Sequence, residues 1–165
     1  MTNECHIHAS AVVHEKAILG KGVKIGPYCT VGPHVVLGDH VELISHVCVD
    51  GYTTVGQGTV VYPFAALGLK PQDLKYNNEP STLDIGNFNQ IREYVTIQPG
   101  TQHGGMKTVV GHHGLFMAQC HIAHDCIVGN HVIMANGATL AGHITVDDEA
   151  FIGGLSAVHQ FVRIG

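Results

Sequence analysis

The sequence predicts an all-β protein, a parallel β-helix whose coils each contain three short strands. Three observations predict it: aliphatic residues recur at every sixth position, glycine often follows them, and the fourth residue after each is mostly small or β-branched. A period of six fits neither an α-helix, with its 3.6-residue period, nor a simple strand with a period of two. It fits a short strand, a corner and another short strand, repeated around a prism.

The aliphatic series begins near the N-terminus and continues without a break to Leu67. Its members are Ile7, Val13, Leu19, Ile25, Val31, Leu37, Leu43, Val49, Val55, Val61 and Leu67. The glycines that follow, such as Gly26 and Gly38, are expected to allow unusual backbone dihedrals at tight corners. The fourth residue, for example Cys29 or Val35, gives a second inward position. Three hexapeptides close one coil, so the chain predicts about eight coils, stacked about 4.8 Å apart.

Two stretches interrupt the repeat, at about 69–84 and about 98–109. Both are rich in Gly, Pro, Asn or charged residues, and they are predicted to be loops that leave the prism. The original phase returns at Ile85, and a shifted phase runs from Val110 to Ile164. We therefore expect one β-helix domain over residues 1–165. Insertions in repeat proteins often carry function, which directs attention to the two loops.

Composition excludes several classes of protein. Apolar residues make up 45% of the chain and charged residues 13%, and the formal net charge is −5, which does not favour a nucleic-acid-binding surface. No stretch approaches the roughly 18 apolar residues of a membrane span, and the N-terminus lacks the pattern of a signal peptide. The five cysteines form no C-x-x-C pair. Free thiols in a cytoplasmic protein are the expectation.

Histidine is the residue type that points to chemistry. The chain has 14, and His121 and His124 lie together in the segment His-Ile-Ala-His-Asp-Cys at 121–126. His143 follows His124 by close to the length of one coil, and His159 follows His143 by a similar interval. The spacing predicts that these imidazoles lie near one line along the prism, on an outer face or corner.

Three interpretations of this line remain open from the residues alone. Three histidines with an open position form a zinc site, as in the hexapeptide γ-class carbonic anhydrases. Alternatively, one neutral imidazole acts as a general base, and Asp125 orients its ring or stabilises the imidazolium. In the third interpretation the histidines lie on the surface without a chemical role, and Asp125 is a solvated corner carboxylate. The chain is then an inert solenoid scaffold.

Four segments, at 72–76, 121–126, 140–143 and 157–161, together resemble the UDP-N-acetylglucosamine 3-O-acyltransferase family. This family belongs to the left-handed β-helix acyltransferases and catalyses the first step of lipid A biosynthesis. The resemblance implies a left-handed helix and a homotrimer with clefts between subunits. It implies UDP-N-acetylglucosamine and a 3-hydroxyacyl-acyl carrier protein as substrates, and no metal or organic cofactor.

The resemblance also implies roles for particular residues. His124 matches the general base that deprotonates the sugar 3-hydroxyl for attack on the thioester. Gly142 matches the position whose N–H holds the developing oxyanion. Other residues match positions that line the substrate cleft: Asp73, Lys75, His121, His143, His159 and Gln160.

The chain departs from the family in three respects. Family members continue with further coils and a C-terminal helical domain, whereas this chain ends at Gly165. We read it as C-terminally truncated, and expect weak nucleotide-sugar binding and weak or absent turnover. Gln98 and Pro99 stand where relatives have a more basic pair. The net negative charge is unusual for a partner of acidic acyl carrier protein.

Overall fold

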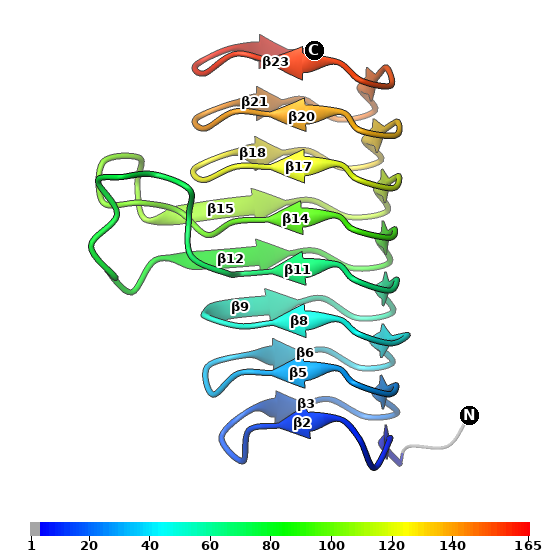
Figure 1. The fold of residues 1–165 in the computed structure, drawn as a ribbon. Helices are drawn as coiled ribbons and strands as arrows, with labels where there is room; N and C mark the ends of the chain where they lie inside the picture. Colours follow the sequence, from blue (N-terminus) through cyan, green and yellow to red (C-terminus); the bar gives the residue numbers. More distant parts are fainter. Residues whose placement is uncertain (1–3) are drawn as a thin grey trace.

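The structure, a computed structural model, describes residues 4–165, which contain 24 strands and no helix. They form three parallel sheets of eight strands each (Figure 1). The first sheet contains β1 (His6–Ile7), β4 (Lys24–Ile25), β7 (Glu42–Leu43), β10 (Val60–Val61), β13 (Gln90–Ile91), β16 (Leu115–Phe116), β19 (Ile133–Met134) and β22 (Phe151–Ile152). The second contains β2 (Val12–Val13), β5 (Thr30–Val31), β8 (Cys48–Val49), β11 (Ala66–Leu67), β14 (Thr96–Ile97), β17 (His121–Ile122), β20 (Thr139–Leu140) and β23 (Ala157–Val158). The third contains β3 (Ile18–Leu19), β6 (Val36–Leu37), β9 (Tyr52–Val55), β12 (Thr82–Ile85), β15 (Lys107–Val110), β18 (Ile127–Val128), β21 (Thr145–Val146) and β24 (Arg163–Ile164).

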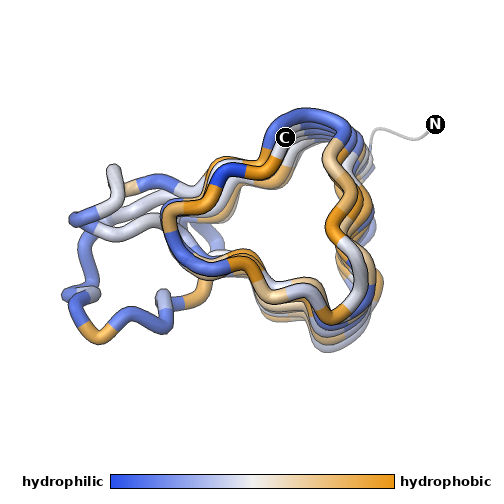
Figure 2. Tube along the Cα trace, turned by 90° about the horizontal axis from the view of Figure 1, so that it is seen from above, coloured by the Kyte–Doolittle hydropathy of each residue, from blue (hydrophilic) through white to orange (hydrophobic). Residues whose placement is uncertain are grey.

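Consecutive strands belong to different sheets, and each strand pairs with the strand three places later in the chain. The chain therefore visits all three faces in every coil, and eight coils stack along one axis. Seen along that axis, the coils superpose as a triangle (Figure 2). The predicted parallel β-helix of about eight coils is confirmed.

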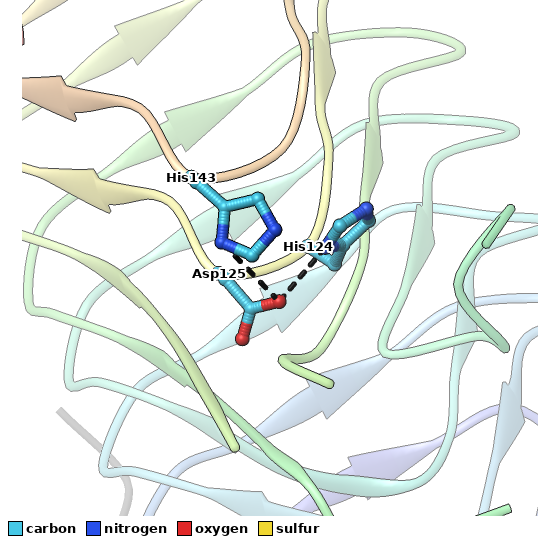
Figure 3. Close-up of side chains that lie close together, drawn as sticks. All are labelled: His124, Asp125 and His143. Carbon is cyan, nitrogen blue, oxygen red and sulfur yellow. Dashed lines mark hydrogen bonds and ion pairs between the residues drawn. The ribbon is translucent and has the colours of Figure 1, made fainter. Parts of the chain in front are cut away.

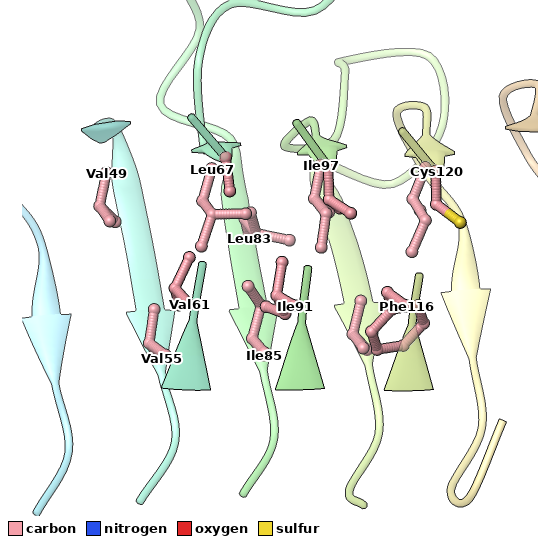
Figure 4. Packing of buried hydrophobic residues seen from close by; sticks show 14 of the residues in the cluster. Val49, Val55, Val61, Leu67, Leu83, Ile85, Ile91, Ile97, Phe116 and Cys120 are labelled. Carbon is pink, nitrogen blue, oxygen red and sulfur yellow. The ribbon is translucent and has the colours of Figure 1, made fainter. Parts of the chain in front are cut away.

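The interior of the prism is filled by the two inward positions of each hexapeptide. In β5, for example, Thr30 is exposed and Val31 is buried, because successive side chains of a strand point to opposite faces. The predicted second inward position is also buried, as at Cys29, Val35 and Val41. Equivalent residues of successive coils contact one another along the axis (Figure 4). Cys29, Cys120 and Cys126 are free and buried, so they act as small core residues.

Most of the glycines that follow the aliphatic residues have a different role from the one predicted, whereas Gly68 does adopt a positive φ, of 76°. Gly26 and Gly38 do not adopt positive φ; positive φ falls two residues further on, for example at Tyr28 and His40. A Cβ on Gly26 would overlap the carbonyl oxygen of Ile44 in the next coil. These glycines are therefore required by the close approach of neighbouring coils rather than by an unusual backbone conformation.

The two loops span residues 68–81 and 98–106, and we name them the first loop and the second loop. The predicted ends at 84 and 109 were wrong, because β12 and β15 begin at Thr82 and Lys107 and pair with each other over four residues. Both loops leave the corner where the second sheet passes to the third (Figures 1 and 2). Along residues 4–165 no helix is long and apolar enough to cross a membrane.

The largest fully buried side chain, Phe116, tests how tightly this core is packed. Replacing it with alanine leaves a cavity between coils, and we expect the free energy of unfolding to fall by about 3–5 kcal/mol. Phe151, which lies in the same sheet but is 65% exposed, gives the matched control. Urea unfolding of the two alanine variants should show a large loss for Phe116→Ala and a small one for Phe151→Ala. Equal losses would contradict this description of the core.

Candidate active site

The candidate site lies at the corner between the second and third sheets, in the coils that follow the two loops. The chain turns there at residues 123–126, 141–144 and 159–162. Asp125, His143 and Phe161 occupy the same place in three successive turns, one coil apart, and each has a φ between 61° and 64°. Because the turns stack, these side chains lie above one another, beside the two loops.

A buried imidazole–carboxylate pair forms the centre of the site (Figure 3). The Nδ1 atom of His124 lies 2.8 Å from Oδ2 of Asp125, and the same oxygen lies 4.0 Å from Nδ1 of His143. His124 is only 7% exposed and Asp125 only 6%. His124 lies at a corner, as one of the two predicted positions, but it is buried there. The alternative of a solvated Asp125 was wrong. The loops and the next coil cover both residues, which places their interaction in a medium less polar than water.

The second loop holds the Asp125 carboxylate. The Thr101 N–H donates to Oδ1 at 2.8 Å, and the Thr101 hydroxyl donates to Oδ2 at 2.6 Å. The backbone N–H of Asp125 donates to the Thr108 hydroxyl at 2.8 Å. The buried carboxylate is thus compensated by hydrogen bonds, as a buried charge must be. Thr101 did not emerge from the sequence, since its partner lies far along the chain and no local pattern marks it.

Gly142 lies against the ring of His124. A Cβ built on Gly142 would lie 2.5 Å from Cε1 and 2.8 Å from Nε2 of that ring, so no side chain fits here. No hydrogen bond from the Gly142 N–H is found within residues 4–165. The residue packed against the imidazole therefore has a backbone donor without a partner in the described residues.

A pocket of about 510 Å³ opens next to this pair. Its lining combines the first loop, the second loop and the stacked turns: Gln72, Asp73, Leu74, Lys75, His103, His124, His143, Gln160 and Phe161. Five predicted site residues are brought together here: Asp73, Lys75, His124, His143 and Gln160. His103 and Phe161 were missed. Counting one coil along the sequence from His143 leads to Phe161, so Phe161 could have been predicted. Nothing in the sequence distinguishes His103 from the other histidines.

Four predicted site residues do not line this pocket. Asp125 and Gly142 lie directly against His124, whereas His121 and His159 lie elsewhere. His121 lies in β17, where its Nδ1 is 2.7 Å from the Thr96 hydroxyl. His159 follows β23 and is exposed, and the place above His143 belongs to Phe161, whose ring stacks on His143 at 4.7 Å. The predicted line of imidazoles therefore ends at His143. Ligand atoms of His124, Asp125 and His143 lie within 4.8 Å of one another, but the third imidazole that the zinc interpretation requires is not part of this cluster.

The two loops are joined to each other as well as to the prism. Glu79 in the first loop accepts hydrogen bonds from the N–H groups of Asn77 and Gln102, and the Gln102 N–H is the main cause of a lowered pKa at Glu79. The buried side chain of Gln98 accepts from the Gln72 N–H at 3.2 Å. The side chain of Gln98 thus connects the two loops. Asp73 accepts from the Lys75 N–H at 3.0 Å, which lowers its pKa and fixes the turn that faces the pocket.

Partial burial gives His121 a testable pH dependence. Burial lowers the pKa of His121, and the charge of nearby His124 lowers it further. The folded protein therefore binds a proton at His121 less readily than the unfolded chain does. The stability contributed by neutral His121 is complete above the unfolded pKa, which is about 6.5. This stability is lost as the pH falls below that value. We expect the unchanged protein to lose more stability between about pH 7 and about pH 5 than His121→Gln does. Urea unfolding at both pH values tests this, with exposed His113→Gln as control; equal losses in the protein and His121→Gln would contradict it.

Comparison with known proteins defines the class first. The family described as bacterial transferase hexapeptide (six repeats) matches residues 16–51. A solved structure of a UDP-N-acetylglucosamine acyltransferase superposes with a TM-score of 0.94 at 51% identity, covering 95% of this chain and 61% of that one. The chain is therefore a left-handed β-helix protein of the hexapeptide-repeat class.

Relatives in sequence give a finer comparison within this class. Acyl-[acyl-carrier-protein]–UDP-N-acetylglucosamine O-acyltransferases from Helicobacter pylori and Paracoccus denitrificans are 57% identical over 114 residues and 58% identical over 106 residues. These matches cover 69% and 64% of this chain. Over the matched region the chain is therefore similar to these O-acyltransferases. It spans less than half the length of the two relatives, 42% and 41%.

Proposed function

We propose that the protein transfers a 3-hydroxyacyl chain from acyl carrier protein to the 3-hydroxyl of UDP-N-acetylglucosamine, the first step of lipid A biosynthesis. One observation carries the proposal: a buried His124–Asp125 pair at the wall of a pocket, with Gly142 packed against the imidazole ring. Similarity to these relatives supports the choice of substrates, because their names specify an acyl-[acyl-carrier-protein] and UDP-N-acetylglucosamine.

The chemistry assigns each imidazole nitrogen a task. The hydrogen bond between Nδ1 and Asp125 leaves Nε2 of His124 for the substrate. Nε2 removes the proton of the sugar 3-hydroxyl as its oxygen attacks the thioester carbon, and Asp125 stabilises the imidazolium that forms. The tetrahedral oxyanion accepts a hydrogen bond from the Gly142 N–H. Collapse forms the ester and expels a thiolate, which takes the proton back from His124.

The rest of the pocket is proposed to hold the two substrates. Asp73 and Lys75 lie on the first loop, and His143 and Gln160 on the stacked turns, so they surround the space in front of His124. His121 and His159 lie outside this pocket, and we assign them to more distant parts of the substrate cleft. The protein is proposed to be cytoplasmic and to work without metal or organic cofactor.

A homotrimer is proposed as the working assembly, with each cleft completed by a neighbouring subunit. Closed cyclic symmetry is the simplest way to give every chain the same contacts. Analytical ultracentrifugation at micromolar concentration should show a trimer. A monomer across that range would contradict the assembly without bearing on the chemistry.

The activity itself is tested by incubating the protein with UDP-N-acetylglucosamine and a 3-hydroxyacyl-acyl carrier protein. Mass spectrometry is expected to find the sugar nucleotide enlarged by one acyl group, and mild base should release that group because it is held as an ester. A sugar that lacks the 3-hydroxyl should not react. Acylation of that analogue would show that a different group is the acceptor.

A further inference from the structure

Thr101 occupies an unusual place for a residue of an exposed loop. It is 1% exposed, and both of its hydrogen-bond donors reach the Asp125 carboxylate, the N–H to Oδ1 and the hydroxyl to Oδ2. Oδ2 is also the oxygen that contacts Nδ1 of His124. The three side chains therefore form a continuous buried series from the second loop to the imidazole.

We propose that Thr101 is a positioning residue for the His124–Asp125 pair, acting through the Asp125 carboxylate. The proposal rests on the proposed function for its kinetic consequence. Two donors at fixed positions determine the rotation of a carboxylate, because each oxygen has its own partner. With Oδ2 directed at Nδ1, the imidazole is held with its Nδ1 proton inward and Nε2 toward the pocket.

The surroundings keep Thr101 itself in place. Its carbonyl oxygen accepts hydrogen bonds from the N–H groups of Gly104 and Met106, at 3.1 and 2.9 Å, which close the loop into a compact turn. Glu79 of the first loop holds the neighbouring Gln102 N–H at 2.9 Å. A Cβ on Gly104 would overlap the carboxyl group of Asp125, so the loop backbone packs directly against the carboxylate. The second loop is thus a rigid support for the pair.

The hydroxyl is tested by Thr101→Val, which keeps the shape and the backbone N–H but removes one donor. We expect kcat to fall by roughly 10- to 10²-fold with KM nearly unchanged, because a misoriented base affects the chemical step rather than substrate binding. Thr101→Ser restores the hydroxyl and should recover most of the rate. The hydrogen-bonded Nδ1 proton of His124 should give a downfield NMR resonance in the protein and in Thr101→Ser, and lose it in Thr101→Val.

Thr59→Val is the matched control, since Thr59 is also buried and donates its hydroxyl to a backbone carbonyl, that of Gly86, in a coil away from the site. It should lower stability without affecting kcat or the His124 resonance. If Thr101→Val does not fold, Gly104→Ala displaces the carboxylate from the other side and should show the same kinetic and NMR changes.

The outcomes separate the two proposals. Loss of the resonance in Thr101→Val, in a protein that acylates the sugar analogue lacking the 3-hydroxyl, would support the positioning role and overturn the proposed function. A normal resonance and normal kcat in Thr101→Val would overturn the positioning role alone. Equal losses in Thr101→Ser and Thr101→Val would also overturn it, because the hydroxyl would then not be the group that matters.

Discussion

Replacing His124 with alanine is expected to lower turnover by roughly 10²- to 10⁴-fold, the usual contribution of a general base. The effect should appear mainly in kcat, since the proton transfer occurs in the transition state. His124 is buried, so the substitution also leaves the Asp125 carboxylate without one partner, and we expect a stability loss of about 1–3 kcal/mol. Steady-state kinetics together with a thermal melt separate the two effects.

The control for this variant is His113→Ala. His113 is an exposed histidine at another corner, stacked between Phe88 and His131 in the same kind of turn. It should retain normal turnover. If His124→Ala kept near-normal turnover in a folded protein, His124 would not be the base, and His143, the other imidazole near the Asp125 carboxylate, would be the next candidate.

Gly142→Ala should affect the same step through geometry. Its Cβ would lie 2.5 Å from Cε1 and 2.8 Å from Nε2 of His124, closer than side-chain carbons approach one another, so the ring or the backbone has to move. Both the base and the proposed oxyanion donor are then displaced. We expect a loss of about 10²-fold or more in kcat, comparable to the loss of an oxyanion-hole donor.

Gly153→Ala provides the comparison, because a Cβ there would meet only the Ser156 hydroxyl, at 3.6 Å. Both glycines lie in the last coils of the chain, and neither has a positive φ, so backbone strain does not distinguish them. Kinetic measurements on the two variants should show a large loss for Gly142→Ala and little change for Gly153→Ala. Similar rates in both would show that contact between Gly142 and the ring is unimportant.

Much of the candidate site could be predicted from the sequence because the fold is periodic. A step of one coil moves the chain to the same place on the next level of the prism, so His124 and His143 were correctly expected to be neighbours. The same rule failed for His159, because its interval from His143 ends short of the stacked position that Phe161 occupies. Even so small a difference places His159 at the start of the turn, directly after β23, rather than at the stacked position.

The residues around the central pair could not be predicted in this way. Thr101 and His103 lie in the second loop, which does not follow the repeat, so their neighbours are set by how the loop folds back on the prism. The burial of His124 and Asp125 has the same origin. A turn of a bare prism would be exposed to solvent, and it is covered here only because two insertions leave the same corner.

The sequence by itself determined the prism: its eight coils, its inward residues and the approximate position of both loops. It could do so because each hexapeptide repeats the same local pattern, and stacking needs no information beyond that pattern. The tertiary structure alone decided which oxygen of Asp125 contacts His124, which loop residue holds that carboxylate, and why Gly142 admits no side chain. Most of these contacts join groups from different coils and loops. Hydrogen bonds depend on small differences in distance and angle, which are set by packing and not by the period of the sequence.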